Sequence, residues 1–60
     1  MKVKDLVNLF SADTNYNIKS ISNPHYLIYQ GRGNRNTNYV DEKEILSVQN
    51  HKNKIIIYIS

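Results

Sequence analysis

The chain has 60 residues, no cysteine and a formal net charge of +3. A chain this short buries only about 60% of the surface that it exposes when unfolded, so we expect one domain, residues 1–60. The lack of cysteine excludes a disulfide framework and a thiolate zinc site. No stretch is apolar over the length of a signal peptide or over the ~20 residues of a membrane span, so the sequence predicts a cytoplasmic protein that does not enter a membrane.

The first segment predicts a helix with one apolar face. Four apolar residues follow the i, i+3, i+4, i+7 spacing that places side chains on the same side of a helix: Val3, Leu6, Val7 and Phe10. Residues 13–15, Asp-Thr-Asn, prefer turns to helix interiors. We therefore expect the helix over about residues 2–12.

Four stretches of alternating, β-branched or aromatic residues predict strands, over about residues 16–21, 25–30, 45–49 and 54–59. Pro24 suits the tight turn of a first hairpin. Residues 31–38 contain no hydrophobic side chain and predict a flexible loop. Asp41 and Glu44 have the spacing of a helix cap, which allows a short helical turn near residues 41–45.

These elements predict an α+β fold in the order α-β-β-β-β. The helix should pack on one face of a small, mainly antiparallel four-stranded sheet. One helix covers only one face of a sheet, so we expect the other face to stay bare. An uncovered apolar face often marks an interaction surface, and the candidates for this face are Ile56, Tyr58, Tyr26 and Ile28.

The residues that could carry out catalysis do not form a catalytic constellation. His25 and His51 lie in predicted turns, and no cysteine or serine triad accompanies them. Asp41, Glu42 and Glu44 lack the spacing of a calcium loop, and helix capping explains the first and last of them without a metal. We therefore expect no catalytic residue, no metal and no cofactor, and a protein that is not an enzyme.

Basic and aromatic residues are the candidates for binding a partner. Arginines on a loop can make bidentate contacts with phosphate or carboxylate groups, and tyrosines on strands can stack on unpaired bases. The candidate partner-binding residues are Arg32, Asn34, Arg35, Tyr26, Tyr29, Lys52, Lys54 and Tyr58. A solvated hairpin tip and a tyrosine-filled core are the alternatives, because polar loops usually face solvent and the chain has no tryptophan.

Both ends of the chain resemble a known group of proteins. Residues 1–7, 44–48 and 54–59 are similar to small accessory proteins of Gram-positive phages and conjugative elements. That group opens with a "VxDLL"-like helix and closes with a "DREVxSI" strand followed by an alternating strand. Residues 41–44 read Asp-Glu-Lys-Glu where the group has Asp-Arg-Glu. The resemblance supplies no catalytic residues.

Genomic neighbours of that group include inhibitors of host defence such as anti-CRISPR proteins. The resemblance therefore implies an accessory protein that binds a host or phage macromolecule, such as an RNA-guided defence nuclease or its RNA, through the bare sheet face and the loop with Arg32 and Arg35. The alternative is a single-stranded RNA- or DNA-binding module that uses the basic loop and the tyrosines. Pairing of two copies through a hairpin edge or sheet face is a further expectation for so small a core.

Overall fold

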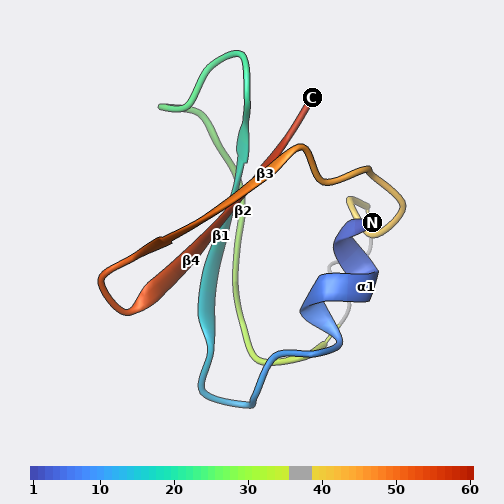
Figure 1. The fold of residues 1–60 in the computed structure, drawn as a ribbon, viewed down its shortest axis with the longest axis vertical. Coiled ribbons are helices and arrows are strands. Elements are labelled where there is room, and N and C mark those ends of the chain that lie inside the picture. The colour runs from blue at the N-terminus through green and yellow to red at the C-terminus, as the bar shows by residue number, and fades with distance from the viewer. Residues whose placement is uncertain (36–38) are drawn as a thin grey trace.

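The computed structural model describes residues 1–35 and 39–60. It has an α+β architecture, with one short helix and one four-stranded sheet (Figure 1). The elements are α1 (Val3–Val7), β1 (Asn15–Ser20), β2 (Leu27–Arg32), β3 (Ser47–His51) and β4 (Lys54–Ile59). The strands lie in the order β2-β1-β4-β3, so the two hairpins sit side by side.

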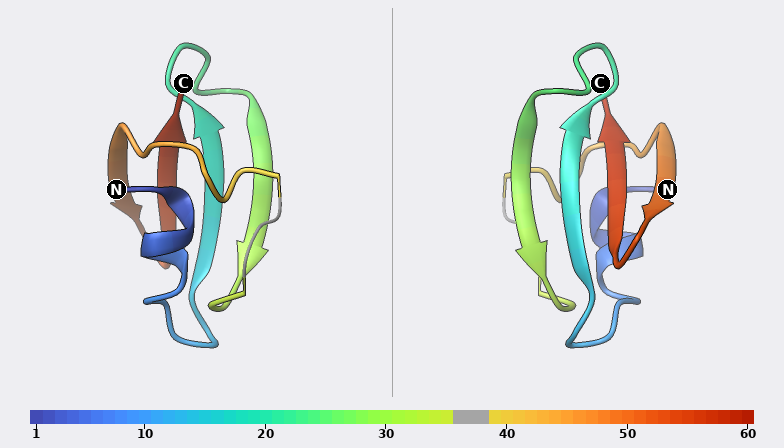
Figure 2. Two further views of the ribbon diagram at one scale, coloured as in Figure 1. Left: turned by 90° about the vertical axis from the view of Figure 1, so that its right-hand side faces the viewer. Right: turned by 90° about the vertical axis from the view of Figure 1, so that its left-hand side faces the viewer.

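The sheet is mixed. Within each hairpin the strands are antiparallel, as predicted, but the central strands β1 and β4 run parallel to each other. The part of the crossover between the hairpins that the structure describes, residues 39–46, lies on the side of α1 (Figure 2). β4 is the most apolar strand, and the central position gives it a hydrogen-bonded neighbour on both sides, which removes the aggregation hazard of an exposed apolar edge.

The helix is shorter than the sequence predicts. A helix over residues 2–12 is wrong, because α1 ends at Val7 and the chain continues in tight turns. In these turns the N–H groups of Leu9 and Phe10 each donate to the carbonyl three residues earlier, at 3.0 Å. Leu6 and Phe10 still pack against the core, so the predicted apolar face is correct although the helix that carries it is brief.

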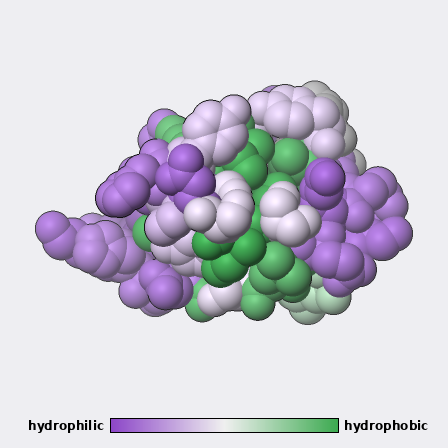
Figure 3. All heavy atoms as spheres, turned by 90° about the horizontal axis from the view of Figure 1, so that it is seen from above, coloured by the Kyte–Doolittle hydropathy of each residue, from purple (hydrophilic) through white to green (hydrophobic). Residues whose placement is uncertain are grey.

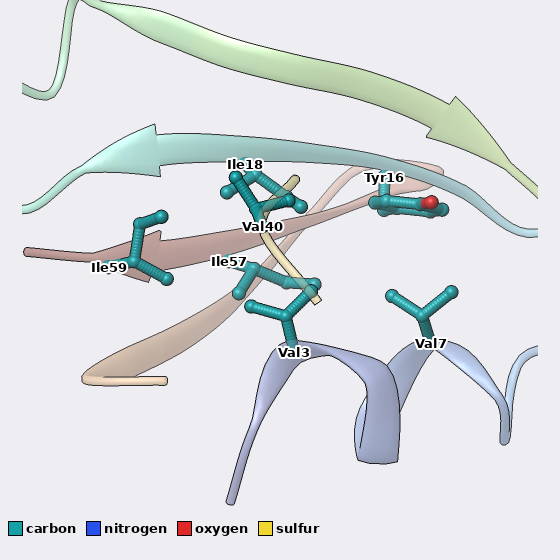
Figure 4. Packing of buried hydrophobic residues seen from close by; sticks show 7 residues of the cluster. All are labelled: Val3, Val7, Tyr16, Ile18, Val40, Ile57 and Ile59. Carbon is teal, nitrogen blue, oxygen red and sulfur yellow. The ribbon is translucent and has the colours of Figure 1, made fainter. Parts of the chain in front are cut away.

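The core lies between the sheet and α1. Its fully or almost fully buried members come from α1, β1, the crossover and β4, and they are Val3, Val7, Tyr16, Ile18, Val40, Ile57 and Ile59 (Figure 4). α1 and the crossover cover the same face of the sheet (Figure 2). All the core residues therefore point to this one face.

Several strands begin or end at other residues than the sequence predicts. β2 and β3 each lie two residues later than expected, and β1 begins one residue earlier. Gly31 and Arg32 belong to β2 because they pair with β1, so the predicted loop 31–38 starts later, at Gly33. Residues 36–38 of that loop lie outside the described residues.

The predicted helical turn near residues 41–45 is not formed. Instead, the N–H of Lys43 donates to the carbonyl of Val40 at 3.1 Å, and Glu44 forms an isolated antiparallel bridge with Lys2. At this bridge the backbone of Glu44 is extended, in the direction of β3. Pairing with a distant segment therefore overrides the local capping signal.

Gly31 is required by close packing in the first hairpin. A Cβ atom at this position would lie 2.5 Å from both the Cζ atom and the hydroxyl oxygen of Tyr16, its partner across the strands. Tyr16 is buried and cannot move aside without disturbing the core. We expect Gly31→Ala to lower the free energy of unfolding by about 1 to 2 kcal/mol, measured by urea denaturation.

Gln30→Ala is the matched control, because Gln30 neighbours Gly31 in β2 and its side chain is exposed. This variant should unfold at nearly the same urea concentration as the wild type. Equal losses in the two variants would contradict the packing of Tyr16 over Gly31.

Candidate functional site

The face of the sheet turned away from α1 is uncovered in the part of the chain that the structure describes (Figure 2, right). Side chains alternate between the two faces of a strand. Since Tyr16, Ile18, Ile57 and Ile59 point to the core, the residues between them point to the opposite side. We call this side the open face.

Strand pairing arranges the open face in three rows that cross the sheet from β2 to β3. The cationic row consists of Arg32, Asn15, Lys54 and His51. The amide row consists of Gln30, Asn17, Ile56 and Gln49. The third row consists of Leu27, Lys19, Tyr58 and Ser47.

Acidic residues are absent from these three rows, although the chain has five of them. Glu42 lies on the side of α1, where it forms ion pairs with Lys2, at 2.8 Å, and with Lys4. Hydrogen bonds from these two ammonium groups lower the pKa of Glu42 to about 2. Glu44 pairs with the N-terminal amine of Met1 at 3.1 Å. The side of α1 thus neutralises much of its own charge.

Positive charge on the open face lacks comparable compensation. Arg32 has a contact with Asp13 at 3.5 Å, and both side chains are largely exposed. Lys19, Lys52 and Lys54 form no ion pair within residues 1–35 and 39–60. The net positive charge of the chain is therefore concentrated on this face, at the end where β3 turns into β4.

An open hollow of about 420 Å³ lies at this end of the open face. Its lining residues are Asn15, Asn17, Lys19, His51, Lys52, Asn53, Lys54 and Ile56. Ile56 is only 9% exposed and gives the hollow an apolar element. The Oδ1 atom of Asn17 is buried and accepts no hydrogen bond from any residue that the structure describes. The hollow thus combines cations, amides and an apolar side chain.

The structure brings together four of the predicted binding residues. Lys52 and Lys54 line the hollow, and Arg32 lies in the same row as Lys54. Tyr58 is half-buried in the third row, where its hydroxyl donates to Oε1 of Gln49 at 3.5 Å. Ile56 and Tyr58 are on the bare face, as expected.

The other predicted residues lie elsewhere. Asn34 and Arg35 are exposed beyond the end of β2, and Tyr26 is 60% exposed just before its start. Tyr29 is on the core side, with its ring 6.2 Å from that of Tyr16 and 6.1 Å from that of Tyr39. For Tyr29 the alternative of a core-filling ring therefore describes its position.

Ile28, one of the four candidates for the bare face, is not on the open face. The register between β1 and β2 shifts after Ile18, so that Tyr29 pairs with Ile18 and Leu27 with Lys19. Ile28 is the extra residue of this bulge, and it packs against the core.

Six lining residues of the hollow are not among the predicted binding residues: Asn15, Asn17, Lys19, His51, Asn53 and Ile56. The alternation in the first strand already places Asn17 and Lys19 on the side opposite Tyr16. That alternation does not predict the parallel pairing of β1 with β4, which brings Asn17 and Lys19 beside Lys54 and Ile56. The sequence predicts a turn at His51 because the predicted third strand, 45–49, ends two residues before β3 does.

Hydrophobic side chains reach the surface at the other end of the sheet. Figure 3 looks down on the end where the chain terminates and shows hydrophobic residues between two hydrophilic flanks. Ile21 and Leu46, 45% and 54% exposed, donate their N–H groups to the carbonyls of Ile59 and Tyr58 at this end. The apolar end and the cationic hollow are thus at opposite ends of the sheet.

No protein-family model, curated protein or solved structure matches the chain. In the described ranges, no cluster of three histidine, cysteine or acidic side chains is placed to hold a metal ion. Those ranges also contain no helix with the length and apolar character needed to cross a membrane. The candidate function therefore follows from the open face alone.

Proposed function

We propose that this domain binds single-stranded nucleic acid on its open face. The observation that carries the proposal is the gathering of Lys19, Lys52, Lys54 and His51 around one hollow whose lining has no carboxylate. Phosphate groups supply the missing negative charge, and release of their counterions favours binding. Adjacent strands lie about 4.8 Å apart, so the cationic row spans roughly 14 Å and can follow a nucleic-acid backbone across the sheet.

A single strand suits the open face better than a duplex does. Duplex DNA is read mainly by a helix or a β-ribbon that enters a groove, whereas α1 lies on the opposite side of the sheet (Figure 2). Ile56 and the half-buried ring of Tyr58 offer apolar contacts to unpaired bases, next to the cations that meet phosphates. Modules that bind single strands combine these two features.

The role of a phage accessory protein that inhibits a defence nuclease stays a prediction from the resemblance. The open face supports one version of it, in which the domain captures the RNA of an RNA-guided nuclease. Mimicry of DNA by an acidic surface does not fit a chain with a net charge of +3. In this version too, the protein acts by binding and not by catalysis.

Binding of a fluorescently labelled, unstructured decamer, followed by anisotropy, tests the proposal. The wild type should bind, with an affinity that falls as salt rises. Lys19→Ala combined with Lys54→Ala should weaken binding about tenfold and reduce the slope of log affinity against log salt by about 1.4, because two phosphate contacts are lost.

The matched control is Lys4→Ala combined with Lys43→Ala, which makes the same change in net charge on the side of α1. This variant should bind almost as well as the wild type. Equal weakening in both double variants would show that net charge acts without the open face, and a wild type that binds no decamer would refute the proposed function.

A further inference from the structure

The amide row has no role in binding phosphates. Gln30, Asn17 and Gln49 lie in one line across the sheet, next to the cationic row. Side-chain amides carry both a donor and an acceptor, and this is the chemistry that reads the edges of bases. A strand whose backbone follows the cationic row would place its bases over the amide row.

Asn17 is the residue of this row that needs a partner. Its Oδ1 atom is buried without a hydrogen bond among the described residues, and buried polar atoms of this kind are rare in folded proteins. The side chain also lines the hollow. The terminal torsion of asparagine is broad, so a small rotation can turn Oδ1 towards a donor that enters the hollow.

We infer that the hollow takes one unpaired base with an exocyclic amino group, which donates to Oδ1 of Asn17. This inference rests on the proposed binding of single strands and adds a base preference to it. The ring lies against Ile56, and the phosphate of the same nucleotide meets Lys54. The hollow, at about 420 Å³, is within the size range of small-ligand sites.

The expected base preference depends on one chemical group, the exocyclic amino group. Adenine, cytosine and guanine carry an exocyclic amino group on the edge used for pairing, whereas uracil and thymine have only carbonyls as exocyclic groups there. A carbonyl would face Oδ1 as a second acceptor and leave both oxygens without a hydrogen bond. The domain should therefore favour strands of adenine, cytosine or guanine over strands of uracil or thymine.

Anisotropy with two matched decamers tests this inference. One contains adenine throughout, and the other contains purine, which replaces the amino group by hydrogen. The wild type should bind the adenine decamer about fivefold more tightly, the ratio that corresponds to one net hydrogen bond. Asn17→Ala should bind both decamers equally, and its slope against salt should match that of the wild type.

Asn50→Ala is the matched control, because it removes an exposed amide from a strand of the same sheet at a position that pairs with Ile55, on the side of α1, and does not line the hollow. It should keep the preference for adenine. Thermal unfolding shows whether each variant is folded, and Asn17→Val, which suits a strand, replaces Asn17→Ala if the alanine variant does not fold.

The outcomes distinguish the inference from the function on which it rests. A wild type that binds both decamers with equal affinity, or an Asn17 variant that keeps the preference, overturns the inference and leaves single-strand binding intact. A wild type that binds neither decamer overturns single-strand binding itself.

Discussion

Ile57→Ala should leave little of the domain folded. Ile57 is completely buried in β4, and it pairs with Ile18 on one side and with Val48 on the other. Loss of a buried isoleucine side chain typically lowers the free energy of unfolding by about 2 to 5 kcal/mol. A domain of this size has only ~3 to 5 kcal/mol in total, so urea denaturation followed by circular dichroism should show a largely unfolded population.

Ile56→Ala is the matched control, because it removes the same atoms from the preceding residue of the same strand. Ile56 points to the hollow and not to the core. Ile56 is 9% exposed, so its loss should lower the free energy of unfolding by about 2 kcal/mol, the lower end of the range for a buried isoleucine, since water can fill the open hollow. The same variant should weaken binding of the decamer. Comparable destabilisation by both substitutions would contradict the assignment of the two isoleucines to opposite faces.

The spacing of apolar residues predicts which way side chains point better than it predicts the backbone hydrogen bonds of the segment. Val3, Leu6, Val7 and Phe10 do lie on one apolar face, yet the helix includes only the first three. Successive tight turns after Val7 keep a rotation close enough to that of a helix to bring Phe10 to the core. A pattern of side chains is thus compatible with more than one pattern of backbone hydrogen bonds.

Strand pairing is the part of the fold that local sequence could not reveal. The β-branched run of β4 identifies a strand with correct bounds, Lys54–Ile59. This run contains no signal for the parallel partner β1, which is separated from β4 in the sequence by β2, the crossover and β3. Val40, the crossover residue that joins the core, is also isolated in the sequence, and its burial depends on the path of the segment around it.

The residues of the candidate site could also be predicted only where they are close together in the sequence. Lys52 and Lys54 are close in sequence, and their position near a hairpin turn could be predicted. Lys19 and Asn17 reach the same hollow only through the parallel register between β1 and β4. The sequence also does not show which tyrosines face the core, because the side of the sheet on which a ring lies depends on strand register. Tyr29 lies on the core side and Tyr58 on the open face.

Tyr16 should make the domain sensitive to alkali. Burial raises the pKa of its hydroxyl from 10.0 to about 12, and the neighbouring Tyr29 and Asp41 add to this increase. The unfolded chain releases the proton near pH 10, whereas the folded chain keeps it up to about pH 12. Folded molecules therefore bind more protons in this range, so the stability is complete below pH 10 and falls as the pH rises to 12.

The expected loss is about 1 to 2 kcal/mol, because each pH unit between the two pKa values corresponds to about 1.4 kcal/mol and solvent near the hydroxyl reduces this difference. Urea denaturation at a series of pH values from neutral to alkaline measures it. Tyr16→Phe keeps the ring but removes the ionisable group, so this variant should resist alkali better than the wild type. Tyr26→Phe, at an exposed position, should not. If Tyr16→Phe is as sensitive as the wild type, the hydroxyl is not enclosed by the core, and the close contact that excludes a side chain at Gly31 is also wrong.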